Sequence, residues 1–131
     1  MPDAPCPCGR LTAKGQPLNL NACCGRWLDQ PAPDAESLMR SRYSAFVRED
    51  ASYLLATWHP STRPASLDFD AGTRWLGLQV RAHQVVDDTH AEVEFVARSR
   101  LAGPGPAMRL HERSRFVREG GRWFYVDGDM L

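Results

Sequence analysis

The chain has 131 residues, of which 16 are basic and 16 acidic, and its four cysteines all lie within the first two dozen positions. This length suits one compact domain with its own hydrophobic core and a short additional segment. The balanced charge gives no overall attraction for nucleic acid or an anionic membrane, and the sequence has no run of the roughly 20 apolar residues that a bilayer-spanning helix requires.

The N-terminus also lacks the basic start and apolar stretch of a secretory signal, so we expect a cytoplasmic location and no membrane partner. In a reducing compartment, clustered cysteines are more often metal ligands or redox groups than structural disulfides. The expected location therefore bears directly on what the cysteines do.

Residues 1–30 are rich in Cys, Pro, Gly and Asn and show no helical or strand period, so they cannot bury a core alone. We expect a zinc-binding segment over residues 1–30 and an α+β domain over residues 31–131. Thiolates are preferred ligands of tetrahedral zinc, and four of them close its coordination shell. The two cysteine motifs, CPCG and CCG, predict one structural zinc ion bound by Cys6, Cys8, Cys23 and Cys24.

Other uses of these cysteines stay open at this stage. Two disulfides would need an oxidising location, and the adjacent Cys23 and Cys24 could bridge each other only with strain. The four residues could also be unliganded thiols or a redox pair, although neither motif has the C-x-x-C spacing of thioredoxin-like chemistry.

Two helices are predicted after Pro33. Asp34 is well placed to cap the first helix, with Glu36 in its positive first turn. The residues that recur at helical spacing in the first helix are Leu38, Met39, Arg42, Tyr43 and Phe46. Those in the second, which is expected to begin near Asp50 and end before Pro60, are Tyr53, Leu54, Thr57 and Trp58.

The pattern changes to strands from Leu67 onward. Leu67 and Phe69 predict a short strand, and residues 70–72 a turn or brief helix. Longer β-rich runs follow at 75–86, 91–101, 107–117 and 122–128, separated by turn sequences at 87–90, 102–107 and 119–121. Two helices followed by consecutive hairpins predict an α+β fold, with the helices packed on one face of an antiparallel sheet.

The same motifs resemble known families. CPCG followed by CCG resembles the SEC-C zinc motif, which also occurs in the C-terminal tail of the SecA translocation ATPase. The order CC, LMRSRYSAF, TWHP, WLGL, LHERSRF and RWFYVDG resembles the YchJ family over nearly the whole chain. This resemblance implies a cone-shaped domain similar to nuclear transport factor 2, in which helices cover a strongly curved sheet. The spacer at residues 9–22 is longer than is usual in SEC-C motifs, which costs little closure entropy.

Cone-shaped domains of this class often enclose a cavity between the helices and the sheet. In the strand predicted at 107–117, side chains alternate between the two faces. If Arg113 and Arg115 face solvent, Glu112 and Ser114 face inward. The acids expected to pair with the two arginines across the strands are Glu92 and Glu94.

A carboxylate on the buried face requires a partner. Arg42 lies on the apolar stripe of the first helix, so we expect Arg42 and Glu112 to meet inside the domain. The residues expected around them are Tyr43, Trp58, His59 and Ser114. The pair could be an architectural tie, or Glu112 or His59 could abstract a proton from a ligand while Arg42 stabilises the developing charge.

Two functions of different class follow. The leading hypothesis is that residues 1–30 dock onto another macromolecule. This segment has a local excess of basic residues (Arg10, Lys14 and Arg26), which suits an acidic protein surface and, less well, nucleic acid. The alternative is a small-molecule-binding protein or an enzyme that uses the cavity, and whether the chain is an enzyme stays open. A well-formed cleft lined by Glu112 or His59 would favour the alternative.

Two further expectations concern the assembly. The segment could serve only to stabilise the fold, with no partner of its own. The exposed face of the sheet would also allow a homodimer.

Overall fold

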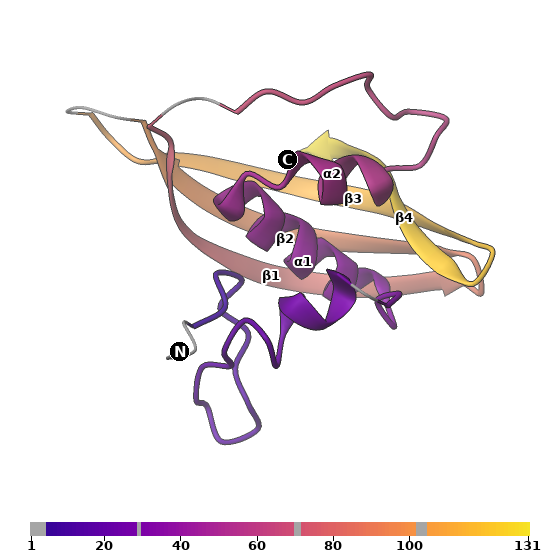
Figure 1. The fold of residues 1–131 in the computed structure, drawn as a ribbon, viewed down its shortest axis with the longest axis horizontal. Coiled ribbons are helices and arrows are strands. Elements are labelled where there is room, and N and C mark those ends of the chain that lie inside the picture. The colour runs from indigo at the N-terminus through magenta and orange to yellow at the C-terminus, as the bar shows by residue number, and fades with distance from the viewer. Residues whose placement is uncertain (1–4, 29, 70–71, 102–104) are drawn as a thin grey trace.

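The computed structural model describes residues 5–28, 30–69, 72–101 and 105–131. Its elements are η1 (Cys24–Leu28), α1 (Ala35–Arg48), α2 (Ala51–Ala56), β1 (Arg74–Asp87), β2 (His90–Arg100), β3 (Met108–Glu119) and β4 (Arg122–Met130). The strands form one antiparallel sheet in the order β1-β2-β3-β4, and α1 and α2 cover one face of it (Figure 1). The predicted α+β meander is confirmed.

Both helices begin where the sequence predicts. The carboxylate of Asp34 accepts the backbone N–H of Ser37 at 2.7 Å, and that of Asp50 accepts the N–H of Tyr53 at 3.1 Å. Helix α2 ends at Ala56, earlier than the predicted stripe, because Trp58 leaves the helix to form a bridge with Tyr125 of β4. None of the helices among the described residues is long and apolar enough to cross a bilayer.

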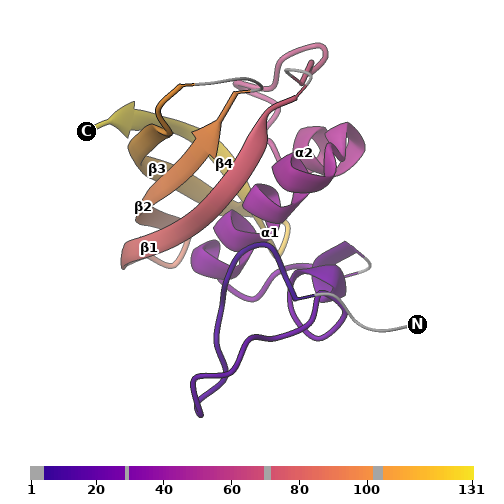
Figure 2. The same ribbon diagram turned by 90° about the vertical axis from the view of Figure 1, so that its left-hand side faces the viewer.

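The sheet bends around α1 because its ladders are irregular. Register shifts interrupt β1 between Trp75 and Gly77 and at two later places, and another lies between Arg115 and Phe116 of β3. Each β-bulge bends its strand and increases the local twist. The result is the curved sheet that faces the helices in Figure 2.

Helix α1 is buried on two sides. Met39, Arg42 and Tyr43 face the sheet, as the predicted stripe requires. Ser37 and Ser44 are also buried, because the N-terminal segment (residues 5–28) packs against them (Figure 2). The second buried side consists of small residues, which let the segment approach the helix closely.

The expected short strand at Leu67 and Phe69 is wrong, because these residues have no regular structure. The ring of Phe69 packs against that of Phe46 on α1, with 6.2 Å between centroids, so Phe69 is apolar because it contacts a helix. In the predicted turns, residues 70–71 and 102–104 lie outside the described residues.

On the solvent face of the sheet, one of the two expected arginine pairs is present. Arg113 lies 3.6 Å from a carboxylate oxygen of Glu94. Arg115 instead pairs with Asp127 at 2.6 Å and Asp129 at 2.7 Å, because the register with β4 brings these acids beside it. Such exposed pairs contribute little to stability, but they show that the predicted orientation of β3 is correct.

The cap at Asp34 provides a test of how α1 begins. Replacing Asp34 with alanine leaves the N–H of Ser37 without its acceptor and should lower the free energy of unfolding by about 1 kcal/mol. Urea denaturation measures the effect. The matched control is Asp68→Ala, which removes an exposed carboxylate without a hydrogen bond among the described residues. Equal losses in the two variants would contradict the capping role.

Candidate functional site

The long spacer between the cysteine motifs folds back on itself. Pro5 pairs with Asn19 and Leu11 with Pro17 in two isolated antiparallel bridges. The intervening chain therefore forms a closed loop, and the two cysteine motifs lie together near its base. This closure explains how a spacer longer than usual can still bring both motifs to one point.

Glycines permit the tight turns beside each motif. Gly9 has φ +75°, a conformation that favours glycine, and its N–H donates to the carbonyl of Cys6 at 3.2 Å. At Gly25, an added Cβ would lie only 2.8 Å from the carbonyl oxygen of Leu20. That oxygen accepts the N–H of Gly25 at 2.7 Å, so the close approach is part of the turn.

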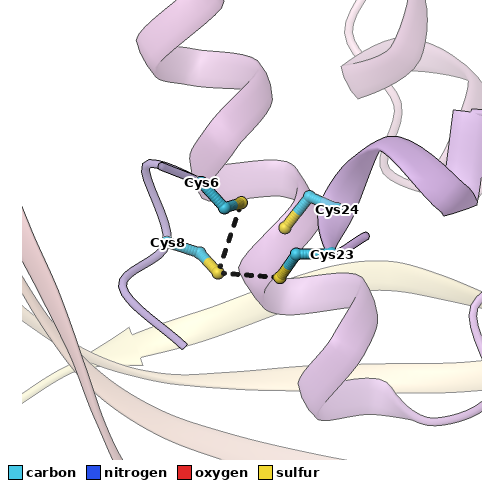
Figure 3. A group of neighbouring side chains, drawn as sticks. All are labelled: Cys6, Cys8, Cys23 and Cys24. Atoms are coloured by element: carbon cyan, nitrogen blue, oxygen red, sulfur yellow. Dashed lines mark hydrogen bonds between the residues drawn. The ribbon is translucent and has the colours of Figure 1, made fainter. Parts of the chain in front are cut away.

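The sulfur atoms of Cys6, Cys8, Cys23 and Cys24 converge (Figure 3). All four lie within 4.8 Å of one another, and the Cys6–Cys8 and Cys8–Cys23 sulfur pairs are each 3.6 Å apart. Four thiolates bound tetrahedrally at about 2.3 Å from one ion would be about 3.8 Å apart. A disulfide would bring two sulfurs to about 2.05 Å, and none is present among these cysteines. The cluster can therefore hold one metal ion.

The electrostatics of the cysteine cluster also favour the binding of a cation. Burial, together with the neighbouring sulfurs of Cys8 and Cys6, raises the pKa of Cys23 to about 12. Interactions with Cys6 and Cys8, and then burial, raise the pKa of Cys24, whereas donation from Cys24 and Cys8 lowers the pKa of Cys6. Thiols this close share their protons, and all four become thiolates together only when a cation replaces those protons.

Two residues of α1 place donors beside the cluster. The hydroxyl of Ser44 lies 3.4 Å from the sulfur of Cys6 and donates to it when Cys6 is a thiolate. The guanidinium of Arg40 donates to the carbonyl of Cys8 at 3.3 Å. A divalent ion bound by four thiolates would keep excess negative charge, which these groups would offset. Neither residue was predicted, although small and basic residues at helical spacing in SLMRSRYS were a usable signal.

A second candidate site is a cavity of about 240 Å³ between α1 and the sheet. Of the residues predicted for such a site, those that line it are Arg42, Tyr43, Trp58, Glu112 and Ser114. Further aromatic residues, Trp75 and Tyr125 among them, complete its walls. The carboxylate of Glu112 and the guanidinium of Arg42 thus line one largely apolar space.

The expected contact between Arg42 and Glu112 is not formed. One nitrogen of Arg42, Nη1, donates to the carbonyl of Leu54 at 2.8 Å and to the hydroxyl of Thr57 at 2.7 Å. No hydrogen bond or ion pair joins Arg42 to Glu112 in the part of the chain that the structure describes. Burial lowers the pKa of Arg42 to about 10. The end of α2 supplies the acceptors that the sequence analysis sought on β3.

Glu112 has hydroxyl groups beside it instead. The hydroxyl of Ser114 donates to its carboxylate. Burial, and then the charge of Glu112, raises the pKa of Tyr125 to about 12. A Cβ at Gly128 of β4 would lie 2.7 Å from Cδ of Glu112, so glycine leaves room for this side chain.

His59 lies outside the cavity, which corrects the expectation that it could act as a base there. Its Nε2 is 2.9 Å from a carboxylate oxygen of Glu119, and its Nδ1 is 2.7 Å from the hydroxyl of Ser61. After α2 the chain pairs briefly with β4, where the N–H of His59 donates to the carbonyl of Tyr125. Extended pairing points neighbouring side chains in opposite directions, so Trp58 faces inward and His59 outward.

Comparisons with known proteins agree with this architecture. The family model for the middle, nuclear-transport-factor-2-like domain of YchJ matches residues 34–128. A UPF0225 protein of a Polaromonas species is 68% identical, covering 98% of this chain and 95% of the relative. A UPF0225 protein of Bordetella parapertussis is 59% identical, covering 97% of this chain and 93% of the relative.

Two solved structures are similar over most of the chain. One is the solution structure of a SEC-C motif containing protein from Rhodopseudomonas palustris, with TM-score 0.80, 33% identity and coverage of 98% and 99% of the two chains. The other is the crystal structure of a SEC-C motif containing protein from Psychrobacter arcticus, with TM-score 0.75, 34% identity and coverage of 94% and 80%. By its sequence and its fold, the chain belongs to the YchJ (UPF0225) family.

Proposed function

We propose that the chain is a small-molecule-binding protein whose N-terminal segment is folded by one structural zinc ion and packs against α1. The zinc assignment is supported by the buried set of four sulfurs, whose spacing fits tetrahedral thiolate coordination. The similarity of the whole chain to SEC-C motif containing proteins supports the same ion. Four protein ligands leave no position for water, so this zinc would stabilise structure and not activate a nucleophile.

The observation that carries the ligand-binding function is the cavity itself. Had Arg42 and Glu112 filled the interior, docking would have been the better hypothesis. Instead, about 240 Å³ remains open between α1 and the sheet, lined mainly by apolar and aromatic side chains with few polar groups. This combination is typical of sites for small organic molecules.

The two sites share one helix. Ser44 of α1 contacts the sulfur of Cys6, while Arg42 and Tyr43 of the same helix line the cavity. Zinc binding would therefore order the segment that packs on the outer side of this helix, whose inner side forms a cavity wall. The metal would thus support the binding site although it lies outside the cavity.

Metal analysis tests the zinc site. Protein purified without chelator should contain about one zinc per chain, and Cys8→Ser should lower this several-fold, because the shell needs four thiolates. Ala22→Ser changes an exposed neighbour of Cys23 and serves as the matched control, with unchanged zinc. Wild-type protein with well under half an equivalent, or full occupancy in Cys8→Ser, would contradict the assignment.

Filling the cavity tests the binding function. Ala97 is buried in the wall, and Ala97→Leu should abolish the binding of naphthalene, used as a neutral apolar probe, by occupying its space. Two-dimensional NMR titration measures binding. Ala82→Leu, on an exposed position of β1, is the matched control and should bind naphthalene as wild type does. Unchanged binding in folded Ala97→Leu would show that the probe binds elsewhere.

A second candidate function, docking to an acidic protein surface, rests on the loop of the N-terminal segment. Its exposed part presents Leu11, which is 57% exposed, close to Lys14, the only lysine in the chain. An apolar side chain beside a cation is a suitable contact for an acidic partner. This candidate is compatible with the cavity, because the two lie on different sides of α1.

The docking candidate can be tested with a variant that leaves the zinc ligands unchanged. Leu11→Ser combined with Lys14→Glu should abolish capture of a specific protein partner from cell lysate while retaining zinc. A partner retained equally by the double variant, a nucleic acid recovered in its place, or no partner at all would count against the proposal.

A further inference from the structure

Aromatic rings form much of the cavity wall, and contacts between them hold each ring in place. Trp75 meets Tyr43 edge to face with 5.6 Å between ring centroids, and it also contacts Phe46 at 6.0 Å. On the other side, Tyr125 makes edge-to-face contacts with Trp58 at 5.1 Å and Phe116 at 5.8 Å. Rings held in this way present preformed surfaces on which a planar ligand can pack.

Arg42 supplies donors to this space. Its two hydrogen bonds both come from Nη1, and its guanidinium lies over the rings of Trp58 and Tyr125, at 5.1 and 4.7 Å from their centroids. The donors at Nε and Nη2 have no hydrogen-bond partner among the described residues. Arg42 lines the cavity, so these two nitrogens are the donors that it can offer to a ligand there.

Glu112 supplies an acceptor on the opposite wall. The hydroxyls of Ser114 and Tyr125 lie beside its carboxylate. An ionised carboxylate has about four acceptor positions on its two oxygens. Acceptor capacity therefore remains for a donor that enters the cavity.

The charges of the cavity wall balance, with one guanidinium and one carboxylate that do not pair with each other. A ligand with net charge would meet a group of its own sign in a largely apolar space, which is unfavourable. A neutral ligand with an acceptor and a donor could satisfy both groups. We infer that the cavity binds neutral, planar heterocycles, of which a fused two-ring cyclic amide is the type, with an acceptor toward Arg42 and a donor toward Glu112.

This inference rests on the proposed ligand-binding function and specifies its chemistry. The test compares four probes of similar size: quinazolin-4-one, a neutral cyclic amide; naphthalene; 2-naphthoate, an anion; and 2-naphthylmethylammonium, a cation. Each is titrated into the zinc-loaded full chain and followed by two-dimensional NMR. Quinazolin-4-one should bind about tenfold or more tightly than the other three, because only it pairs with both groups without a like charge.

The variant Glu112→Gln keeps the shape of the side chain and removes its charge. It should weaken quinazolin-4-one about tenfold, leave naphthalene unchanged and strengthen 2-naphthoate, because the cavity then carries a net positive charge. Arg113→Gln is the matched control, since Arg113 is the next residue on β3 and faces solvent. It should change none of the four affinities.

The outcomes distinguish failure of the inferred ligand class from failure of the proposed binding function. If naphthalene or a charged probe binds as tightly as quinazolin-4-one, or if Glu112→Gln leaves the order of affinities unchanged, the ligand class is wrong and the binding function stands. If none of the probes shifts the resonances of cavity residues, the binding function itself fails, and the ligand class fails with it.

Discussion

Four buried sulfur atoms converge beside α1, and their convergence gives the N-terminal segment its structure. Without a cation, Cys6, Cys8, Cys23 and Cys24 compete for protons within 4.8 Å of one another. With a cation, four thiolates at similar separations would form a tetrahedral shell. The N-terminal segment has no strand or helical period and cannot bury a core alone. It then covers a second side of α1. The metal would thus act on the domain through this helix.

Helix α1 connects the two sites because its opposite sides contact different parts of the structure. The side with Ser37 and Ser44 is occupied by the N-terminal segment, and the side with Arg42 and Tyr43 faces the curved sheet. The bulges that curve the sheet keep it from closing fully onto the helix. The space that remains has charges on opposite walls, so its chemistry is set by two elements distant in sequence. Loss of the metal would therefore move α1, which forms one wall of the cavity.

Local patterns predicted the parts of the structure that local physics controls. The cap at Asp34, the start of the second helix near Asp50, the four long strands and the inward orientation of Glu112 follow from side-chain type and alternation. The partners of Arg42 did not follow, because one is the backbone carbonyl of Leu54, which carries no side-chain signal, and the other, Thr57, meets Arg42 only through tertiary packing. Phe69 was misassigned because contact with a helix can make a residue apolar as a strand position does. The cavity was implied by the family resemblance, whereas its aromatic walls depend on tertiary packing.

X-ray absorption at the zinc K-edge would report which atoms surround the ion and at what distance. We expect a first shell of four sulfur atoms at about 2.3 Å, with no nitrogen or oxygen ligand. The same shell should persist when a cavity probe is bound, since the ion would lie outside the binding site. A shell containing nitrogen or oxygen, or one with fewer than four sulfurs, would contradict the claim that these four cysteines bind a single ion.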